Sequence, residues 1–469
     1  MLDTPPEDSR RAKTCQAGAL YAAMIVATVA AFVIIRHFGE SQPGRPAPAA
    51  DSRGAAQPTG GNQLLPHVLI GLAAVVVAGR VVGGVFQYLG QPPVIGEVIA
   101  GILLGPSCLG RISPAAAAWV LPEAIVPIMG VLAQLGVILY MFVVGLELDI
   151  GLLRQQGRAI VAISHASITA PFLLGALLAL GVAPTLAGPH GQFTVFALFL
   201  GVAMSITAFP VLARILTDLG LSRTPLGVAA LTCAATDDVT AWCLLALVVG
   251  VAKSQIGASF TVIVLTLVYI AAMFLVVRPM LLRLTPRADD SPPTRGMFAA
   301  LLVGLLISSL ATEWIGVHAI FGAFVLGAVI PHDSPVAKSL IERVEDVASV
   351  LFLPAFFAFT GMRTQIGLIS SAGGWLLCGA IIAVATTGKF GGTLAAARCT
   401  GFSWRDAAQL GVLMNTRGLM ELIVLNIGLD LEVISPTLFV MMVVMAIVTT
   451  TATTPVLKLL TSKRQAATH

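Results

Sequence analysis

Long apolar stretches separated by short polar turns dominate the chain from residue 63 onward. A helix needs about 20 predominantly apolar residues to cross a bilayer, and stretches of that length recur almost without interruption. The pattern predicts an all-α polytopic membrane protein. We place thirteen spans at approximately 64–89, 92–108, 127–148, 158–183, 193–217, 226–252, 258–284, 296–314, 317–331, 343–362, 369–397, 405–428 and 435–460.

A further apolar stretch, residues 18–35, follows the basic run Arg10, Arg11 and Lys13. A signal peptide has the same order of basic and apolar regions, but this stretch is long and its small-residue cleavage site is ambiguous, so we favour an uncleaved anchor. The next segment is rich in Pro, Gly and Ala, a composition typical of a disordered linker. We divide the chain into a basic start with an extra helix (1–36), a linker (37–62), a transmembrane domain (63–461, with core helices at about 158–252 and 369–460) and a short cytoplasmic tail (462–469).

Composition agrees with a chain that lies mostly in lipid. It is 57% hydrophobic and 11% charged, whereas a soluble domain carries about 25% charged residues. The six cysteines are scattered, mostly inside apolar segments, and show no CxxC spacing. This excludes a disulfide framework. We expect the lipid bilayer as the main partner, and no nucleic acid.

The Lys and Arg residues in short loops predict the orientation, because such residues are concentrated on the cytoplasmic side. With the N-terminus inside, fourteen spans place eighteen of them inside and six outside. The predicted outer residues are Arg36, Arg45, Arg53, Arg111, Lys253 and Arg363. Both termini are therefore expected in the cytoplasm. Arg80, Lys389 and Arg417 remain at membrane depth, where they need partners.

Two adjacent carboxylates, Asp237 and Asp238, lie in the middle of the span at 226–252. An ionisable group at this depth costs about 2.5–3.5 kcal/mol even on a lenient scale, so it marks a functional site by default. Helical neighbours point about 100° apart, so one carboxylate can line a cavity while the other faces the bundle. The same oxygens can bind a proton or a small cation but not both. We predict that this pair binds the transported monovalent cation and its competing proton; a purely structural pair is the alternative.

Two spans contain residues that interrupt a helix. Pro210 removes a backbone donor and clashes with the carbonyl four residues earlier, so we expect the helix to unwind near Thr207. The motif MNTRGLME, residues 414–421, weakens the span at 405–428 and is its counterpart, as in an inverted repeat. Discontinuous helices supply free carbonyls and dipole ends at transport sites. A simple proline kink is the alternative.

Three charged side chains accompany these interruptions. Arg417 and Glu421 are four residues apart and can pair along one helix face; they either fix the crossing of the two broken helices or contact the cation. Lys389 is an isolated amine in the span at 369–397. A buried ammonium needs a carboxylate, and we predict an ion pair between Lys389 and Asp237.

Together these residues resemble the monovalent cation:proton antiporter-2 family of the sodium/hydrogen exchanger superfamily, close to bacterial relatives of the plant cation/H+ exchangers. The resemblance covers about residues 64–460. It is carried by QPPVIGE (91–97), LELD (146–149), MSITAFPVLARIL (204–216), TDDVTAW (236–242), VHAIFGAFVLG (317–327), LPAFFAFTGM (353–362) and MNTRGLMELIVLNIG (414–428).

The resemblance implies a homodimer in the bacterial cytoplasmic membrane. Each protomer would have a dimerisation domain and a six-helix core, in which two broken helices cross and move in an elevator-like manner. It implies that Thr207 borders the ion site, that Asp238 is the essential carboxylate and that Lys389 partners Asp237. No cofactor is expected.

Two departures from the family pattern matter. Plant members usually have Asn before the essential Asp, whereas this chain has Asp237, as the electrogenic sodium/proton antiporters do. The chain also ends at His469 without a large cytoplasmic or nucleotide-binding domain, so we expect no regulation by ligands of such domains.

We therefore hypothesise a transporter, not an enzyme, that exchanges Na+ or K+ for H+ electrogenically. Two other classes stay open. One is a proton-uncoupled potassium channel, although the sequence has no filter signature of the TVGYG kind. The other is a sodium-coupled symporter of an organic anion on a similar scaffold.

Overall fold

The computed structural model describes residues 7–41, 64–147, 158–189, 191–222, 224–253, 259–284, 294–331 and 334–462. In these segments the chain is almost wholly helical, with one isolated β-bridge between Ala187 and Ile434. Most of the predicted linker, residues 42–62, and nearly all of the predicted tail lie outside them. The helices of the first half are α1 (Glu7–Glu40), α2 (Leu64–Tyr88), α3 (Pro93–Leu104), α4 (Leu109–Ile112), α5 (Pro114–Val120), η1 (Glu123–Ile125), α6 (Val126–Glu147), α8 (Arg158–Leu186), α9 (Phe193–Ser205), α10 (Phe209–Asp218) and α11 (Pro225–Lys253).

The second half continues in the same way, with two short π-helical turns inside long helices. Its elements are α12 (Ser259–Ala272), η2 (Met273–Val277), α13 (Arg278–Leu284), α14 (Arg295–Ile315), α15 (Ala319–Val329), α16 (Pro335–Val347), η3 (Ala348–Phe352), α17 (Leu353–Arg363), η4 (Ile366–Leu368), α18 (Ala372–Cys399), α19 (Trp404–Met414), α20 (Leu419–Asp430) and α21 (Pro436–Ser462).

The predicted spans correspond to these elements. Within the described residues, twelve helical stretches are long and apolar enough to cross a membrane, and the bent pair α19–α20 adds a thirteenth. The remaining predicted span, 317–331, contains only the 11-residue α15. At 1.5 Å per residue this helix is about 16 Å long, shorter than a bilayer core. It ends at Val329 because Ile330 is extended and precedes Pro331.

Two boundaries differ from the predicted ones. The stretch between the second and third predicted spans forms the short helices α4 and α5, and Ser113 caps α5 by accepting the N–H of Ala116. The predicted span 343–362 begins eight residues earlier, at Pro335, where Ser334 caps the helix. Its first half is amphipathic and polar, so apolar content alone does not reveal it.

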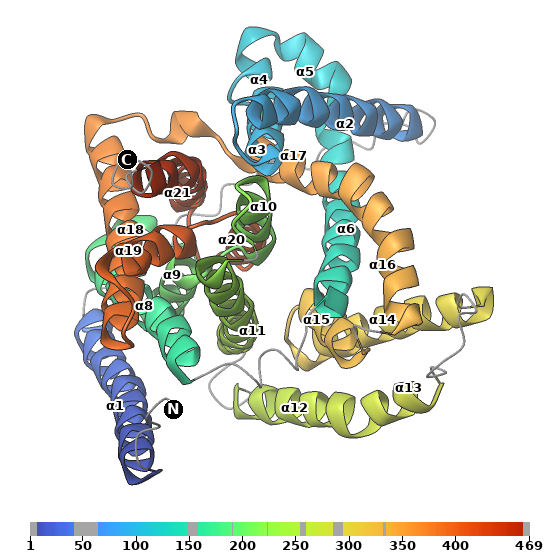
Figure 1. Ribbon diagram of the computed structural model, residues 1–469. Coiled ribbons are helices and arrows are strands. Elements are labelled where there is room, and N and C mark those ends of the chain that lie inside the picture. Colours follow the sequence, from blue (N-terminus) through green and yellow to red (C-terminus); the bar gives the residue numbers. More distant parts are fainter. Residues whose placement is uncertain are drawn as a thin grey trace.

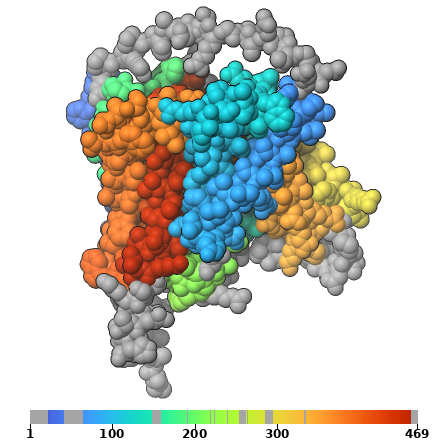
Figure 2. Space-filling view, turned by 90° about the horizontal axis from the view of Figure 1, so that it is seen from above, coloured from blue at the N-terminus to red at the C-terminus, as the bar shows by residue number. Residues whose placement is uncertain are grey.

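The helices gather into two groups (Figure 1). The scaffold group comprises α2, α3, α6 and α14–α17, and the crossing group comprises α8–α11 and α18–α21; each packs mainly within itself. Figure 2 shows α21, in red, between α18, in orange at the left, and the blue helices of the scaffold group. The extra helix α1 packs on α8 and α9 of the crossing group, where the rings of Phe32 and Phe172 are 5.7 Å apart.

Glycine allows α3 and α17 to approach closely inside the scaffold group. A Cβ atom on Gly101 of α3 would lie 2.6 Å from the Cα of Ala358 on α17 and 2.7 Å from the carbonyl oxygen of Phe357. Backbone atoms cannot rotate away as a flexible side chain could. The close contact therefore requires glycine at this position. Small residues allow the same close approach in membrane helix packing generally.

We expect Gly101→Ala to lower the free energy of unfolding by about 1–3 kcal/mol, because the added methyl group must push two helices apart. The matched control is Gly379→Ala in α18, where nothing lies within 4 Å of the added carbon. Thermal unfolding in detergent compares the two variants. Equal melting temperatures would contradict this account of the packing.

Candidate ion-binding site

The span formed by α9 and α10 is interrupted at Ile206–Ala208. Ile206 and Ala208 have extended backbone angles, and Pro210 lies in the first turn of α10, where its missing N–H leaves no bond unmade. The predicted unwinding near Thr207 is therefore present. It leaves free carbonyls at the end of α9 and free N–H groups at the start of α10.

The second interruption separates α19 from α20, which are bent by 45° relative to each other. The residues between them, 415–418, are those of the motif singled out in the sequence. Gly418 lies against α10, since a Cβ at this position would be 2.7 Å from a methyl carbon of Val211. The two broken spans thus touch at their interruptions.

Hydrogen bonds connect the two breaks directly. The N–H of Ala208 donates to the carbonyl of Thr416 at 3.0 Å. The hydroxyl of Thr207 lies 3.1 Å from the carbonyl of Met414, the last residue of α19, and 2.9 Å from Oδ2 of Asp237. Thr207 is fully buried. The crossing therefore brings a carboxylate of α11 to the point where both helices are open.

Both carboxylate oxygens of Asp237 accept hydrogen bonds. It accepts hydrogen bonds from the hydroxyls of Ser164 at 2.5 Å, Ser167 at 2.8 Å and Thr207 at 2.9 Å. The ammonium of Lys389 is 2.8 Å from its Oδ2, and both side chains are fully buried. The predicted ion pair is present. Sequence reasoning missed the two serines, although two hydroxyls three residues apart on one face of α8 are a detectable signal.

Lys389 also binds the end of α9, besides pairing with Asp237. Its Nζ donates to the carbonyl oxygen of Ser205 at 2.6 Å and lies 3.4 Å from the hydroxyl of Ser167. Ser205 is the last residue of α9, where carbonyls lack helical partners and the helix dipole is negative. The amine therefore neutralises a helix end and a carboxylate together.

Arg417, in the break between α19 and α20, also donates to carbonyls at the end of α9. Its guanidinium donates to the carbonyls of Ala203 at 3.1 Å and Met204 at 2.7 Å, and to Glu421 at 2.9 Å. Its backbone N–H donates to the hydroxyl of Thr450, which donates back to the Arg417 carbonyl. The predicted pairing of Arg417 with Glu421 is present, and the arginine precedes α20 in the break. This geometry favours the structural role in fixing the crossing.

Asp238 differs sharply from its neighbour. Its side chain is buried, with 4% of its surface exposed, yet neither carboxylate oxygen has a hydrogen-bond partner in the described part of the chain. In the α19–α20 break, Oδ1 of Asn415 is another buried oxygen without a partner there. Burying an unsatisfied polar group is costly. Two such oxygens on Asp238 are therefore positioned to accept a proton or a cation.

A cavity of about 270 Å³ separates the scaffold and crossing groups beside this crossing. Tyr140, on its scaffold side, is close enough to Asp238 to interact electrostatically. Arg80, the third cation predicted at membrane depth, interacts with Glu97, and both residues face this space. The remaining lining residues are Pro92, Pro93, Val94, Pro210, Val211, Arg214, Ser349, Leu353, Phe357 and Leu419.

Comparison with known proteins shows the family to which the chain belongs. The model of the sodium/hydrogen exchanger transmembrane family matches residues 72–462. The chain belongs to this family, which confirms the resemblance found in the sequence. The Na+/H+ antiporter NhaS4 of Synechocystis is 42% identical over 391 residues, which cover 83% of this chain and 95% of the relative.

One further relative and one solved structure extend the comparison. Cation/H+ antiporter 20 of Arabidopsis thaliana is 40% identical over 84% of this chain, and the match spans about half of its length, 48%. The solved structure of the sodium proton antiporter MjNhaP1 from Methanocaldococcus jannaschii has a TM-score of 0.62 at 13% identity, covering 84% of this chain and 99% of that one. This likeness confirms the predicted fold class. The relatives are transporters rather than enzymes, and the chain is a multi-pass membrane protein.

We expect Lys389→Ala to destabilise the protein by about 3–5 kcal/mol, because it leaves a buried carboxylate and a helix end without their cation. The double variant with Asp237→Asn should recover part of this loss, since the uncompensated charge is gone. Thermal unfolding in detergent measures both. The control is Lys338→Ala on the exposed side of α16; a Lys389→Ala variant as stable as this control would contradict the prediction.

Proposed function

We propose that this protein is a secondary antiporter that exchanges Na+ or K+ for H+ across the bacterial cytoplasmic membrane. The observation that carries the proposal is the contrast between two adjacent buried carboxylates. Among the described residues Asp237 has four donors, whereas Asp238 has none. The chain's membership of the sodium/hydrogen exchanger family supports the same activity.

Asp238 is proposed as the exchange site itself. A carboxylate in a buried position is poorly solvated, so it gains from binding either a proton or a monovalent cation. The two ligands compete for the same oxygens, and each excludes the other. If only the occupied forms cross the barrier, every cation moved one way requires protons moved the other way, which is obligatory exchange.

The pair of Asp237 and Lys389 is proposed to carry the second proton of an electrogenic cycle. A cation bound at Asp238 repels the neighbouring ammonium through a poorly screening interior. Asp237 would keep three hydroxyl donors after the amine lost its proton. Two protons would then exchange for one cation, and one net charge would cross the membrane in each cycle.

The moving part is proposed to be the crossing group, in an elevator-like displacement against the scaffold group of a homodimer. Both broken spans and both carboxylates belong to the crossing group, and the hydrogen bonds between the breaks join them into one unit. The cavity of about 270 Å³ lies between the two groups rather than inside either one. Displacement along this boundary would move the site without breaking its ion pairs.

We expect Asp238→Asn to abolish exchange while the protein stays folded, because the amide cannot alternate between a proton and a cation. Proteoliposomes with an acidic lumen and an internal pH-sensitive dye report alkalinisation when Na+, K+ or Li+ is added outside. Wild type should respond to specific cations and Asp238→Asn should match empty liposomes.

The control is Asp346→Asn, a carboxylate exposed on α16, which should exchange normally. A response retained in Asp238→Asn would exclude this residue as the exchange site. A cation flux in wild type without proton movement would favour a channel. Sodium-stimulated uptake of a labelled organic anion would favour a symporter.

We expect the exchange to follow the membrane potential. Moving one charge through 100 mV corresponds to about 2.3 kcal/mol, or roughly a 50-fold change in the equilibrium cation ratio. The potential is set with an ionophore for an ion that the protein does not carry. In Lys389→Gln, which has no amine to release the second proton, the ratio should no longer respond. A wild-type ratio indifferent to the potential would contradict electrogenic exchange.

A further inference from the structure

α17 of the scaffold group and α20 of the crossing group face each other along the boundary between the groups, and the two ends of this boundary differ. Where these helices begin, Leu353 and Leu419 line the cavity of about 270 Å³. Where they end, the space between α6, α15, α17 and α20 shrinks to about 30 Å³. The boundary is open at one end and nearly closed at the other.

Polar side chains connect the helices at the closed end. Arg363, the last residue of α17, lies 2.6 Å from the carboxylate of Asp430, the last residue of α20. It also donates to Oδ1 of Asn426 at 3.1 Å. The amide nitrogen of Asn426 donates to the hydroxyl of Thr360 at 2.8 Å, so three hydrogen bonds join α20 to α17.

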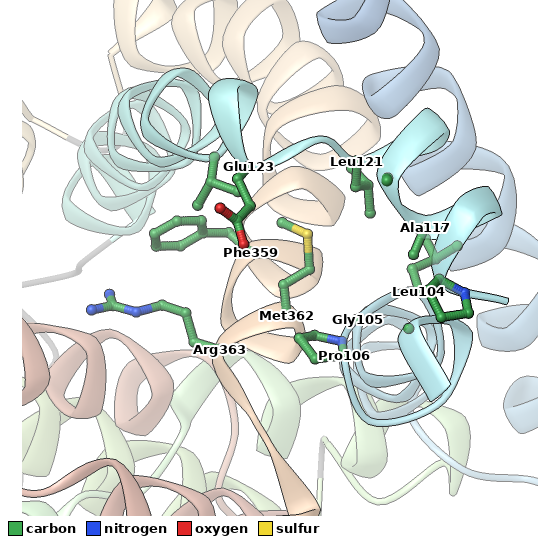
Figure 3. A pocket seen from close by; sticks show the side chains of 13 residues that line it. Leu104, Gly105, Pro106, Ala117, Leu121, Glu123, Phe359, Met362 and Arg363 are labelled. Atoms are coloured by element: carbon green, nitrogen blue, oxygen red, sulfur yellow. The ribbon is translucent and has the colours of Figure 1, made fainter. Parts of the chain in front are cut away.

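The guanidinium is held in place on its own helix as well. It lies over the ring of Phe359, 5.2 Å from the centroid, a favourable arrangement for a cation. Arg363 and Phe359 also line a second cavity of about 410 Å³ within the scaffold group, and Figure 3 shows the Arg363 side chain pointing away from Gly105 and Pro106 on its opposite wall. The side chains of Arg363 and Asp430 are 23% and 44% exposed, so the pair is accessible to water and can break and re-form.

We propose that Arg363, Asn426 and Asp430 form a latch that closes one end of the boundary between the two groups. The latch holds the state in which the opposite end is open, and it must separate when the crossing group moves. The distribution of Lys and Arg along the sequence places Arg363 outside, so the latch closes the outer side. This inference rests on the proposed alternating movement. It concerns three residues that lie outside the exchange site.

The test measures access to the closed end. All six natural cysteines are replaced and Ile427→Cys is introduced, because Ile427 lines the small space beside the latch and is 4% exposed. A membrane-impermeant maleimide is added to right-side-out membranes. Arg363→Gln should raise the labelling rate about fivefold, since an accessible ion pair shifts a two-state population only modestly.

The charge-swapped double variant, Arg363→Asp with Asp430→Arg, should return labelling toward the wild-type rate because the pair can form again. The matched control is Arg36→Gln, which removes another predicted outer arginine, one that pairs with Glu40 on α1. A rate unchanged in Arg363→Gln, a rate raised equally by Arg36→Gln, or a swap that labels like Arg363→Gln would each overturn the latch.

Labelling requires no transport, so this test separates the latch from the proposed exchange. If the protein exchanges cations for protons but labelling does not respond to Arg363→Gln, the latch alone is wrong. If labelling responds and reconstituted protein shows no exchange, the latch stands and the proposed function fails.

Discussion

The carbonyls at the end of α9 are the constraint on which the site depends. A helix that stops inside an apolar protein leaves backbone oxygens without helical partners, and no bulk water is present to donate to them. Lys389 binds the carbonyl of Ser205, and Arg417 binds those of Ala203 and Met204. The break in one span is thus stabilised by cations from two other elements. Without these donors the carbonyls at the open helix end would have no partners.

These two cations determine which carboxylates of the crossing have an ion-pair partner. Lys389 is balanced by Asp237, and Arg417 is balanced by Glu421. Asp238 is the acidic residue of the crossing that is left over, with both oxygens free of hydrogen bonds in the described residues. In this state the other charges of the crossing are therefore matched among themselves. One carboxylate remains without a fixed partner, as the proposed exchange site requires.

Hydrogen bonds between the two breaks also hold the crossing group together as one body. The bonds from Ala208 to Thr416 and between Thr207 and Met414 join the two broken spans, so a movement of one moves the other. Bonds to the scaffold group at the far end are more exposed, and Arg363 makes two of them. A tightly bonded crossing group with accessible contacts to the scaffold group fits the proposed sliding movement better than local bending.

Much of the architecture is determined by the sequence alone. Apolar length specifies the spans, Pro210 specifies a break, and the cost of burying charge in lipid singles out Asp237, Asp238 and Lys389. The spans and the break are present in the structure because each depends on one residue or one stretch of the chain. The tertiary structure decided what depends on distance between helices: that Ser164 joins the donors of Asp237, and that Asp238 has no donor among the described residues. Charge balance in the sequence predicted the pair of Lys389 and Asp237. The other partners depend on the distances between helices, which packing sets.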